Sequence, residues 1–293
     1  MRKEYKPDDK FKRWARALQF DYRENVLKDF NEYRAPQVLL KEDNAKRGLI
    51  FYEGFRDLIL SKTGNVATPL TANMLRSEHI PYNLFTPLET MPEIATEVFS
   101  KMIGMPIKQV SAITIEYAGK GDKSLYLNDR TSFDTFVEYL TPDHRKGGIG
   151  IEVKYTENEY PLGDKEGKDI AGDNRLYADM TAQSGYYLPQ LEISMFLTAH
   201  HLRQIWRNHI LGYSMLHKGD IDFIHHVHIY PEHNEHFHNL ALPEYRTLLT
   251  EKGKESFKTI TYENYFDALD QYRDDEKVAD WVKYLRKRYL GME

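Results

Sequence analysis

Three polar residues near the middle of the chain have types and spacing that suit chemistry at a bound cation. Glu152 and Lys154 are separated by one residue in IGIEVKYTE, so the alternation of a β-strand puts both side chains on one face. Asp134 lies in the preceding segment, TSFDTFVEYL, which also alternates like a strand. Because neighbouring strands lie about 4.8 Å apart, an Asp and a Glu on them come within reach of one shared metal ion.

The chemistry expected of such a trio is phosphodiester hydrolysis. Two close carboxylates repel each other unless a proton or a metal ion lies between them. Mg²⁺ suits them because it is a hard cation that prefers oxygen ligands and keeps several waters, whose pKa it lowers. Lys154 would then orient the attacking water or stabilise charge on a phosphate oxygen. The common alternative for an isolated Glu-x-Lys is a cross-strand salt bridge on a solvated sheet face.

The periodicity of the sequence changes from helical to extended and back around these residues. Helices are expected at about 10–27, 48–63, 71–89 with a bend or break at Pro81, 91–103, 191–218, 262–272 and 276–290. Strands are expected at 110–119, 131–140, 149–157 and 222–231, with a long loop at 158–190. We predict an α/β (α+β) fold with one mixed sheet in a single domain, 1–293, divided into a mostly helical part (1–105), a catalytic core (106–235) and a C-terminal helical part (236–293).

The order of these elements, together with the motif on them, resembles a known nuclease superfamily. S-F-D, seventeen residues and E-V-K lie on consecutive strands, after a helix and a first strand and before a helix and a fourth strand. This αβββαβ order resembles the PD-(D/E)XK nuclease superfamily, which has the restriction-endonuclease-like fold. NAKRGLIFYEG, RSEHIPYNLFTPL, QIWRNHILGYSM and VHIYPEHN are similar to segments of a bacterial family within it. The resemblance spans about residues 10–290, and Phe133 stands where the motif has Pro, a position that varies.

The resemblance implies a nuclease that uses Mg²⁺, with Mn²⁺ as a substitute, and that acts on a nucleic acid, with DNA as the expected one. Asp134 and Glu152 would be metal ligands, and Lys154 would be the catalytic base or the phosphate partner. Gln204 and Arg207, one turn apart on the following helix, would brace the site or touch phosphate. The alternative to this role is that Gln204 and Arg207 serve only as a helix cap or in an ion pair.

Two further carboxylates are candidates for the same site. Glu78, expected on the helix before the sheet, would orient a metal-bound water, as a Glu at that place often does in the superfamily; its alternative is a helix-surface or capping role. Glu116, on the first expected strand, would join the metal ligands or face solvent.

The distribution of charge suggests where a nucleic acid would bind, although the net charge is −5. No acidic residue lies between Glu192 and Asp220, which is expected either of a phosphate-facing surface or of a buried helix. The basic residues of this acid-free segment are Arg203, Arg207 and Lys218. The long loop contains Lys165, Lys168 and Arg175 and would form a clamp over the substrate.

Histidine gives a competing signal, since ten of the twelve histidines lie between His200 and His238. His228, His233, His236 and His238 suggest a zinc-dependent hydrolase, because imidazole is a good zinc ligand. Their spacing matches no zinc pattern, so structural or exposed histidines are favoured. A catalytically silent, nuclease-like module that binds nucleic acid or protein is the remaining alternative.

Composition excludes several other classes of site. The chain has 293 residues and no cysteine, so disulfides, thiolate zinc sites, iron–sulfur clusters and cysteine nucleophiles are ruled out. There is no run of about 18 apolar residues, so we expect no membrane span. The start of the chain is basic but lacks the apolar segment of a secretory signal, so we expect a cytoplasmic protein.

Overall fold

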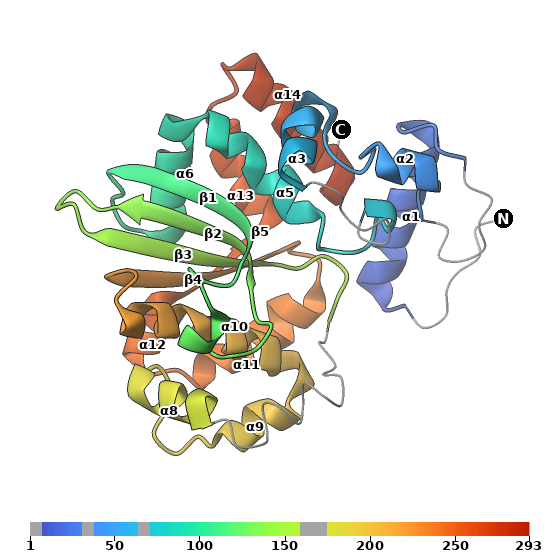
Figure 1. Ribbon diagram of the computed structural model, residues 1–293. Coiled ribbons are helices and arrows are strands. Elements are labelled where there is room, and N and C mark those ends of the chain that lie inside the picture. The colour runs from blue at the N-terminus through green and yellow to red at the C-terminus, as the bar shows by residue number, and fades with distance from the viewer. Residues whose placement is uncertain (1–7, 31–37, 64–70, 159–174, 293) are drawn as a thin grey trace.

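A five-stranded mixed sheet lies at the centre of the computed structural model, which describes residues 8–30, 38–63, 71–158 and 175–292 (Figure 1). The strands are β1 (Gln109–Tyr117), β2 (Phe133–Leu140), β3 (Lys146–Val153), β4 (Phe223–Tyr230) and β5 (Phe257–Thr261). They lie side by side in sequence order. β1, β2 and β3 are antiparallel, whereas β3, β4 and β5 are parallel. The α/β class and the mixed sheet predicted from the sequence are confirmed.

Helices cover both faces of this sheet (Figure 1). Before β1 the chain forms α1 (Lys10–Asn25), α2 (Glu42–Lys46), η1 (Glu53–Phe55), α3 (Arg56–Thr63), α5 (Ile80–Phe85), η2 (Thr86–Thr90) and α6 (Pro92–Ile103). Between β1 and β4 it forms η3 (Lys123–Leu125), α8 (Arg175–Ser184), α9 (Ile193–Thr198) and α10 (His200–Lys218). After β4 it forms η4 (His236–Ala241), α11 (Leu242–Thr247), α12 (Glu251–Ser256), α13 (Tyr262–Asp270), α14 (Glu276–Leu285) and η5 (Arg286–Leu290). No helix among the described residues is long and apolar enough to cross a membrane.

Each face of the sheet has its own apolar core. On one face, Ile151 and Val227 pack with residues of α6, α13 and α14, including Trp281. On the other face, Phe136 and Trp206 belong to a cluster that joins the sheet to α8, α9 and α10. Because β3 is covered on both sides, every one of its residues after Lys146 is buried, polar ones included.

Glycines explain why β3 begins earlier than the sequence predicts. Gly147 and Gly150 lie opposite aromatic rings of β2, and an added Cβ would come within 2.0 Å of Tyr139 and 2.3 Å of Phe133. Glycine is generally depleted in strands, so the first residues of β3 resemble a turn in the sequence. At the other end the strand stops at Val153, although the Lys154 N–H still donates to the Ile229 carbonyl at 2.9 Å.

Several predicted elements differ from the structure. The short edge strand β5 was not predicted, and the predicted helix at 191–218 is two helices, α9 and α10, separated at Ala199. The helix predicted at 48–63 begins only at Glu53, and the loop predicted at 158–190 contains α8. Residues 73–79 form turns and a bridge from Asn73 to Leu39 rather than a helix. The helix α5 begins only at Ile80, and Pro81 lies in its first turn, where proline is well accommodated because its missing N–H is not needed there.

Candidate active site

Acidic side chains from three strands share one row across the sheet. The register of β1 and β2 puts Glu116 opposite Asp134, since the residue pairs on either side of them match. Continuing the register of β2 and β3 by one residue puts Asp134 opposite Glu152. The parallel register of β3 and β4 puts His228 next to Glu152. Residues opposite each other on adjacent strands point to the same face, so the sheet brings these carboxylates together.

Asp134 is held where β2 and β3 stop pairing. The Val153 N–H donates a hydrogen bond of 2.6 Å to Asp134 Oδ2. Burial raises the pKa of Asp134 well above its usual value, and the neighbouring Glu152 carboxylate raises this pKa further, while the Lys154 ammonium opposes both. Asp134 is therefore a half-buried carboxylate that a cation would stabilise in its charged form.

Glu152 has no exposed surface, and three side chains bind its carboxylate. Oε1 accepts hydrogen bonds from Lys154 Nζ at 2.5 Å and from Gln204 Nε2 at 2.5 Å. Asn208 Nδ2 donates to Oε2. Gln204 and Asn208 are four residues apart on α10, so their side chains lie on one helix face. Burial raises the pKa of Glu152, and the Lys154 ammonium lowers it.

Lys154, which directly follows β3, connects the end of this strand with α10. Besides Glu152, its ammonium donates to Gln204 Oε1 at 2.8 Å. Burial alone would lower the pKa of Lys154, but the Glu152 and Asp134 carboxylates outweigh it and raise that pKa. The side chain therefore keeps its positive charge at neutral pH, which suits charge stabilisation or orientation of a water better than it suits a general base.

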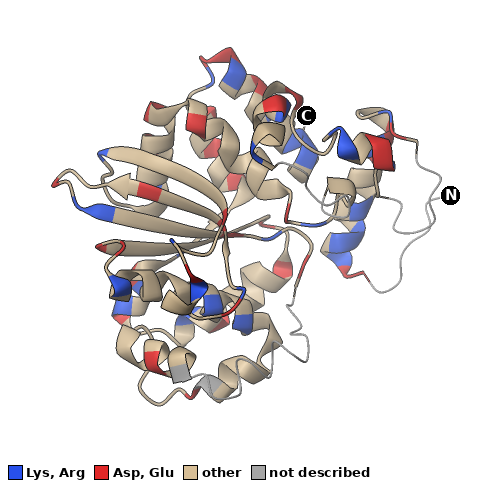
Figure 2. Cartoon of the chain, in the orientation of Figure 1, with Lys and Arg blue, Asp and Glu red and all other residues tan. Residues whose placement is uncertain are grey.

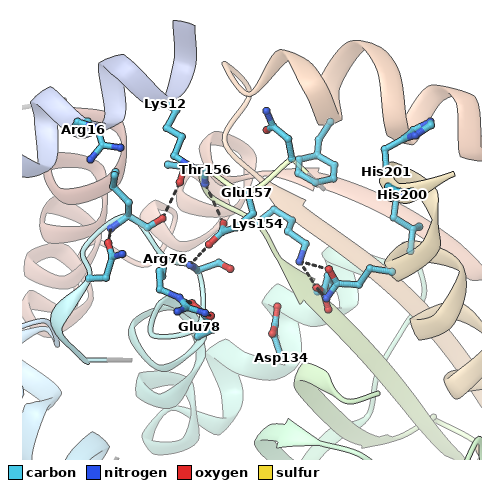
Figure 3. Close-up of a pocket in the computed structure, with 18 residues that line it drawn as sticks. Lys12, Arg16, Arg76, Glu78, Asp134, Lys154, Thr156, Glu157, His200 and His201 are labelled. Carbon is cyan, nitrogen blue, oxygen red and sulfur yellow. Dashed lines mark hydrogen bonds and ion pairs between the residues drawn. The ribbon is translucent and has the colours of Figure 1, made fainter. Parts of the chain in front are cut away.

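These three residues lie at the floor of a cavity of about 500 Å³. Figure 3 shows Lys154 and Asp134 between two groups of side chains, Lys12 and Arg16 on one side and His200 and His201 on the other. The wall residues come from five segments: α1, residues 73–78, residues 156–158, the first two turns of α10, and Phe237.

Glu78 lines this cavity, but it does so from a turn and not from the predicted helix. Its carboxylate forms an ion pair with Arg76. The N–H of neighbouring Ser77 donates to Glu157 Oε1 at 2.7 Å, which connects this turn with the segment that follows β3. The Tyr155 and Thr156 N–H groups donate to the other oxygen of Glu157.

Two residues of the site were not predicted from the sequence. Glu157 also lines the cavity and is the last residue of IGIEVKYTE. The only sequence signal that could have pointed to it is its position three residues after Lys154. Asn208 lies one helical turn after Gln204, a spacing that could have pointed to a shared partner.

Glu116 lies in the same row as Asp134 but does not line the cavity. Its backbone φ is 57°, an uncommon value for a residue with a side chain, and Ser132 Oγ donates to its carboxylate at 3.2 Å. Burial raises the pKa of Glu116, and Glu152 and Glu78 contribute further to the rise. Its role as a metal ligand stays a prediction.

The basic residues predicted to face a nucleic acid are mostly engaged within the protein. Arg207 is buried and pairs with Asp129 at 2.8 Å, and Arg203 is buried and donates to the Leu197 carbonyl. Lys218 packs over the Tyr126 ring, 4.4 Å from its centroid. This arrangement favours the buried-helix alternative for the acid-free segment. Lys165 and Lys168 lie outside the described residues, and Arg175 begins α8.

Among the described residues, no three His, Asp or Glu side chains are already arranged to hold a metal ion. The histidines proposed for zinc differ in environment: His228 is buried, whereas the side chain of His233 is 81% exposed. The donor chemistry fits a hard cation instead. Asp134 and Glu152 offer carboxylate oxygens from neighbouring strands at the floor of one cavity, and desolvation raises the pKa of each, so a further cation would favour their charged forms.

The sequence of this chain is similar to that of a known protein family. A family model described as the PD-(D/E)XK nuclease superfamily matches residues 6–291, nearly the whole chain. No curated protein and no solved structure gives a significant match. The fold, with an antiparallel β1–β3 unit followed by the parallel strand β4, is consistent with the restriction-endonuclease-like fold of this superfamily.

Proposed function

This chain belongs to the PD-(D/E)XK nuclease superfamily, and we propose that it is a nuclease that hydrolyses phosphodiester bonds in DNA with the help of Mg²⁺ or Mn²⁺. One observation carries the proposal: Asp134, Glu152 and Lys154, the three residues of the superfamily motif, meet at the floor of one cavity. An ordinary solvated salt bridge would not recess all three in this way.

The roles of the residues follow from their surroundings. Asp134 and Glu152 would hold the metal, which when bound lowers the pKa of a coordinated water and offsets charge on the phosphate. Lys154, which keeps its charge, would orient the attacking water or bind a phosphate oxygen. Gln204 and Asn208 would fix the orientation of Glu152 through their hydrogen bonds to its carboxylate.

Nuclease assays with single substitutions test this assignment. We expect DNA cleavage that requires Mg²⁺ and stops in EDTA, and we expect Asp134→Asn to reduce its rate at least about 100-fold, since metal-ion catalysis contributes several kcal/mol. Asn keeps an acceptor for the Val153 N–H, so the variant should fold, which circular dichroism can check. Lys154→Met should also lose cleavage, and if that variant fails to fold, Asp134→Asn decides the question.

Matched controls lie on the same strands. Glu138→Gln changes a carboxylate of β2, and Lys146→Met removes an exposed ammonium from β3; neither residue lines the cavity. Both variants should cleave like the wild type. Wild-type rates in Asp134→Asn and Lys154→Met would rule out the proposed site.

The second candidate is a catalytically silent member of the superfamily that binds nucleic acid. It is favoured by the saturation of Glu152, whose two oxygens are already occupied by Lys154, Gln204 and Asn208. Binding that is equal with and without Mg²⁺, together with no turnover of any nucleic acid, would support this alternative.

A further inference from the structure

The floor of the cavity is recessed behind walls that do not belong to the sheet. Glu152 has no exposed surface and Lys154 is 8% exposed. The cavity of about 500 Å³ is bounded on one side by α1 and residues 73–78, and on the other by the first turn of α10 (Figure 3). A phosphate that passes between α1 and α10 would therefore reach Asp134, Glu152 and Lys154.

The depth of the site discriminates between forms of nucleic acid. An intact duplex is stiff, with a persistence length of about 150 base pairs, and bringing one of its phosphates to groups with so little exposed surface requires bending or opening it. A single strand has no such constraint and can follow a groove that contacts its backbone. The walls thus admit one strand more readily than two.

The charge on the α1 wall favours a phosphate backbone. Residues 12–16 of α1, KRWAR, contain three Lys or Arg and no acid, and Figure 2 shows this basic stretch on the helix. Two cations of the cavity wall are already neutralised: Arg16 pairs with Asp8, and Arg76 pairs with Glu78. Lys12 lines the same cavity, and its ammonium forms no hydrogen bond or ion pair with any residue that the structure describes.

We propose that the substrate crosses the site as a single DNA strand between α1 and α10, and that Lys12 binds a phosphate of its backbone. The inference rests on the proposed nuclease function and adds the form of the substrate and a binding residue outside the catalytic sheet. Lys12 would hold the strand in place, while Asp134, Glu152 and Lys154 act on the bond that is cut.

Binding measurements in EDTA test the proposal without turnover. The probe is a fluorescent oligonucleotide of about 12 nucleotides, either single-stranded or annealed to its complement, followed by anisotropy. We expect the wild type to bind the single strand at least about fivefold more tightly than the duplex. Lys12→Ala should weaken single-strand binding by about five- to tenfold, for any base sequence, and should reduce the slope of log K against log salt by about 0.7.

Lys10→Ala is the matched control. Lys10 lies on the same helix and carries the same charge, but it is exposed, faces Glu235 at 3.8 Å and does not line the cavity. This variant should bind and cleave like the wild type. An equal loss in Lys10→Ala and Lys12→Ala would overturn the specific role of Lys12, because it would show only a general effect of charge.

The remaining outcomes separate this inference from the proposed function. Equal binding and equal Mg²⁺-dependent cleavage of duplex and single strand would overturn the single-strand path and leave the nuclease assignment intact. Single-strand binding through Lys12, without cleavage in Mg²⁺ or Mn²⁺, would support the path and contradict the hydrolytic proposal. No binding of either probe by the wild type would overturn the path.

Discussion

At the scale of single residues, Glu152 carries a negative charge on a side chain that is only 1% exposed. Its carboxylate meets one ammonium and two side-chain amides, so every donor that satisfies it comes from Lys154 or from α10. A buried ion pair is expensive to form, but breaking it by removing one partner costs more, because the other charge stays buried. The pair that would perform the chemistry is therefore also a determinant of stability.

A double-mutant cycle on this pair follows from that balance. Lys154→Met should lower the free energy of unfolding by about 3 kcal/mol, since it leaves the Glu152 carboxylate buried without a cation. The double variant Glu152→Gln/Lys154→Met should be more stable than Lys154→Met alone. Urea denaturation at pH 7 measures both, with Lys146→Met as the exposed control. Additive effects of the two substitutions would show that the pair is not coupled in the folded protein.

At the scale of elements, α10 connects the candidate site to a second, purely structural cluster. Gln204 and Asn208 reach Glu152, whereas the next residue, His209, donates to or accepts from Tyr245 at 3.0 Å and Ser256 at 2.7 Å. The His209 ring stacks on His226 of β4, with centroids 5.7 Å apart. His226 also stacks on Phe257 of β5, so α10, β4 and β5 are joined by aromatic packing.

The burial of His226 predicts sensitivity to acid. Burial lowers the pKa of His226 to about 3. As the pH falls below about 6.5, the unfolded chain binds a proton at this residue while the folded chain does not, so stability is lost between about pH 6.5 and pH 3. The titratable groups facing it are His209 of α10 and His228 of its own strand, and burial likewise lowers the pKa of both.

His226→Phe isolates this effect, because Phe keeps the stacking and cannot titrate. Neither nitrogen of His226 has a hydrogen-bond partner among the described residues, so the substitution loses no such bond. When the pH falls from 7 to 5, the free energy of unfolding of the wild type should drop by about 2 kcal/mol more than that of the variant. Denaturation at the two pH values measures this difference, with exposed His217→Gln as control. An unchanged pH dependence in His226→Phe would contradict a neutral, buried His226.

At the scale of the whole molecule, the two ends of the described chain meet behind the candidate site. Gln19 of α1 is buried, and its Nε2 donates to the Tyr155 hydroxyl and to the Arg288 carbonyl, each at 2.8 Å. Tyr155 directly follows Lys154, so the side-chain amide of Gln19 connects α1 with the segment after β3 and with η5. The wall that carries Lys12 is thereby fixed to the floor of the cavity.

Gln19→Ala should therefore destabilise the whole protein and not only its N-terminal helix. It leaves the buried Tyr155 hydroxyl and the Arg288 carbonyl without their donor, which costs about 2 kcal/mol of unfolding free energy. A single cooperative transition at lower denaturant is expected, measured by circular dichroism. Arg13→Gln, an exposed change on the same helix, should stay within about 0.5 kcal/mol. A separate early transition confined to α1 would contradict this linkage.

Local patterns in the sequence were enough to predict the residues of the motif and the strands that carry them. The alternation around Asp134 and Glu152 depends only on neighbours along the chain, and such alternation is the local pattern that predicts a strand. Elements with weak local signals were missed. β5 has only five residues, and the first turn of β3 contains the glycines that make room for Tyr139 and Phe133.

The sequence by itself predicted the superfamily through a resemblance of its segments, and the mixed sheet through local periodicity and the order of elements; the three motif residues are its proposal for the site. Only the tertiary structure decided what surrounds them. Asn208 binds Glu152, and Glu157 lines the cavity. Arg203 and Arg207 are buried, and Lys12 lines the cavity although it lies more than a hundred residues before Asp134 in the sequence. Such contacts are set by how helices pack on the sheet, and packing between distant segments leaves no fixed spacing in the sequence.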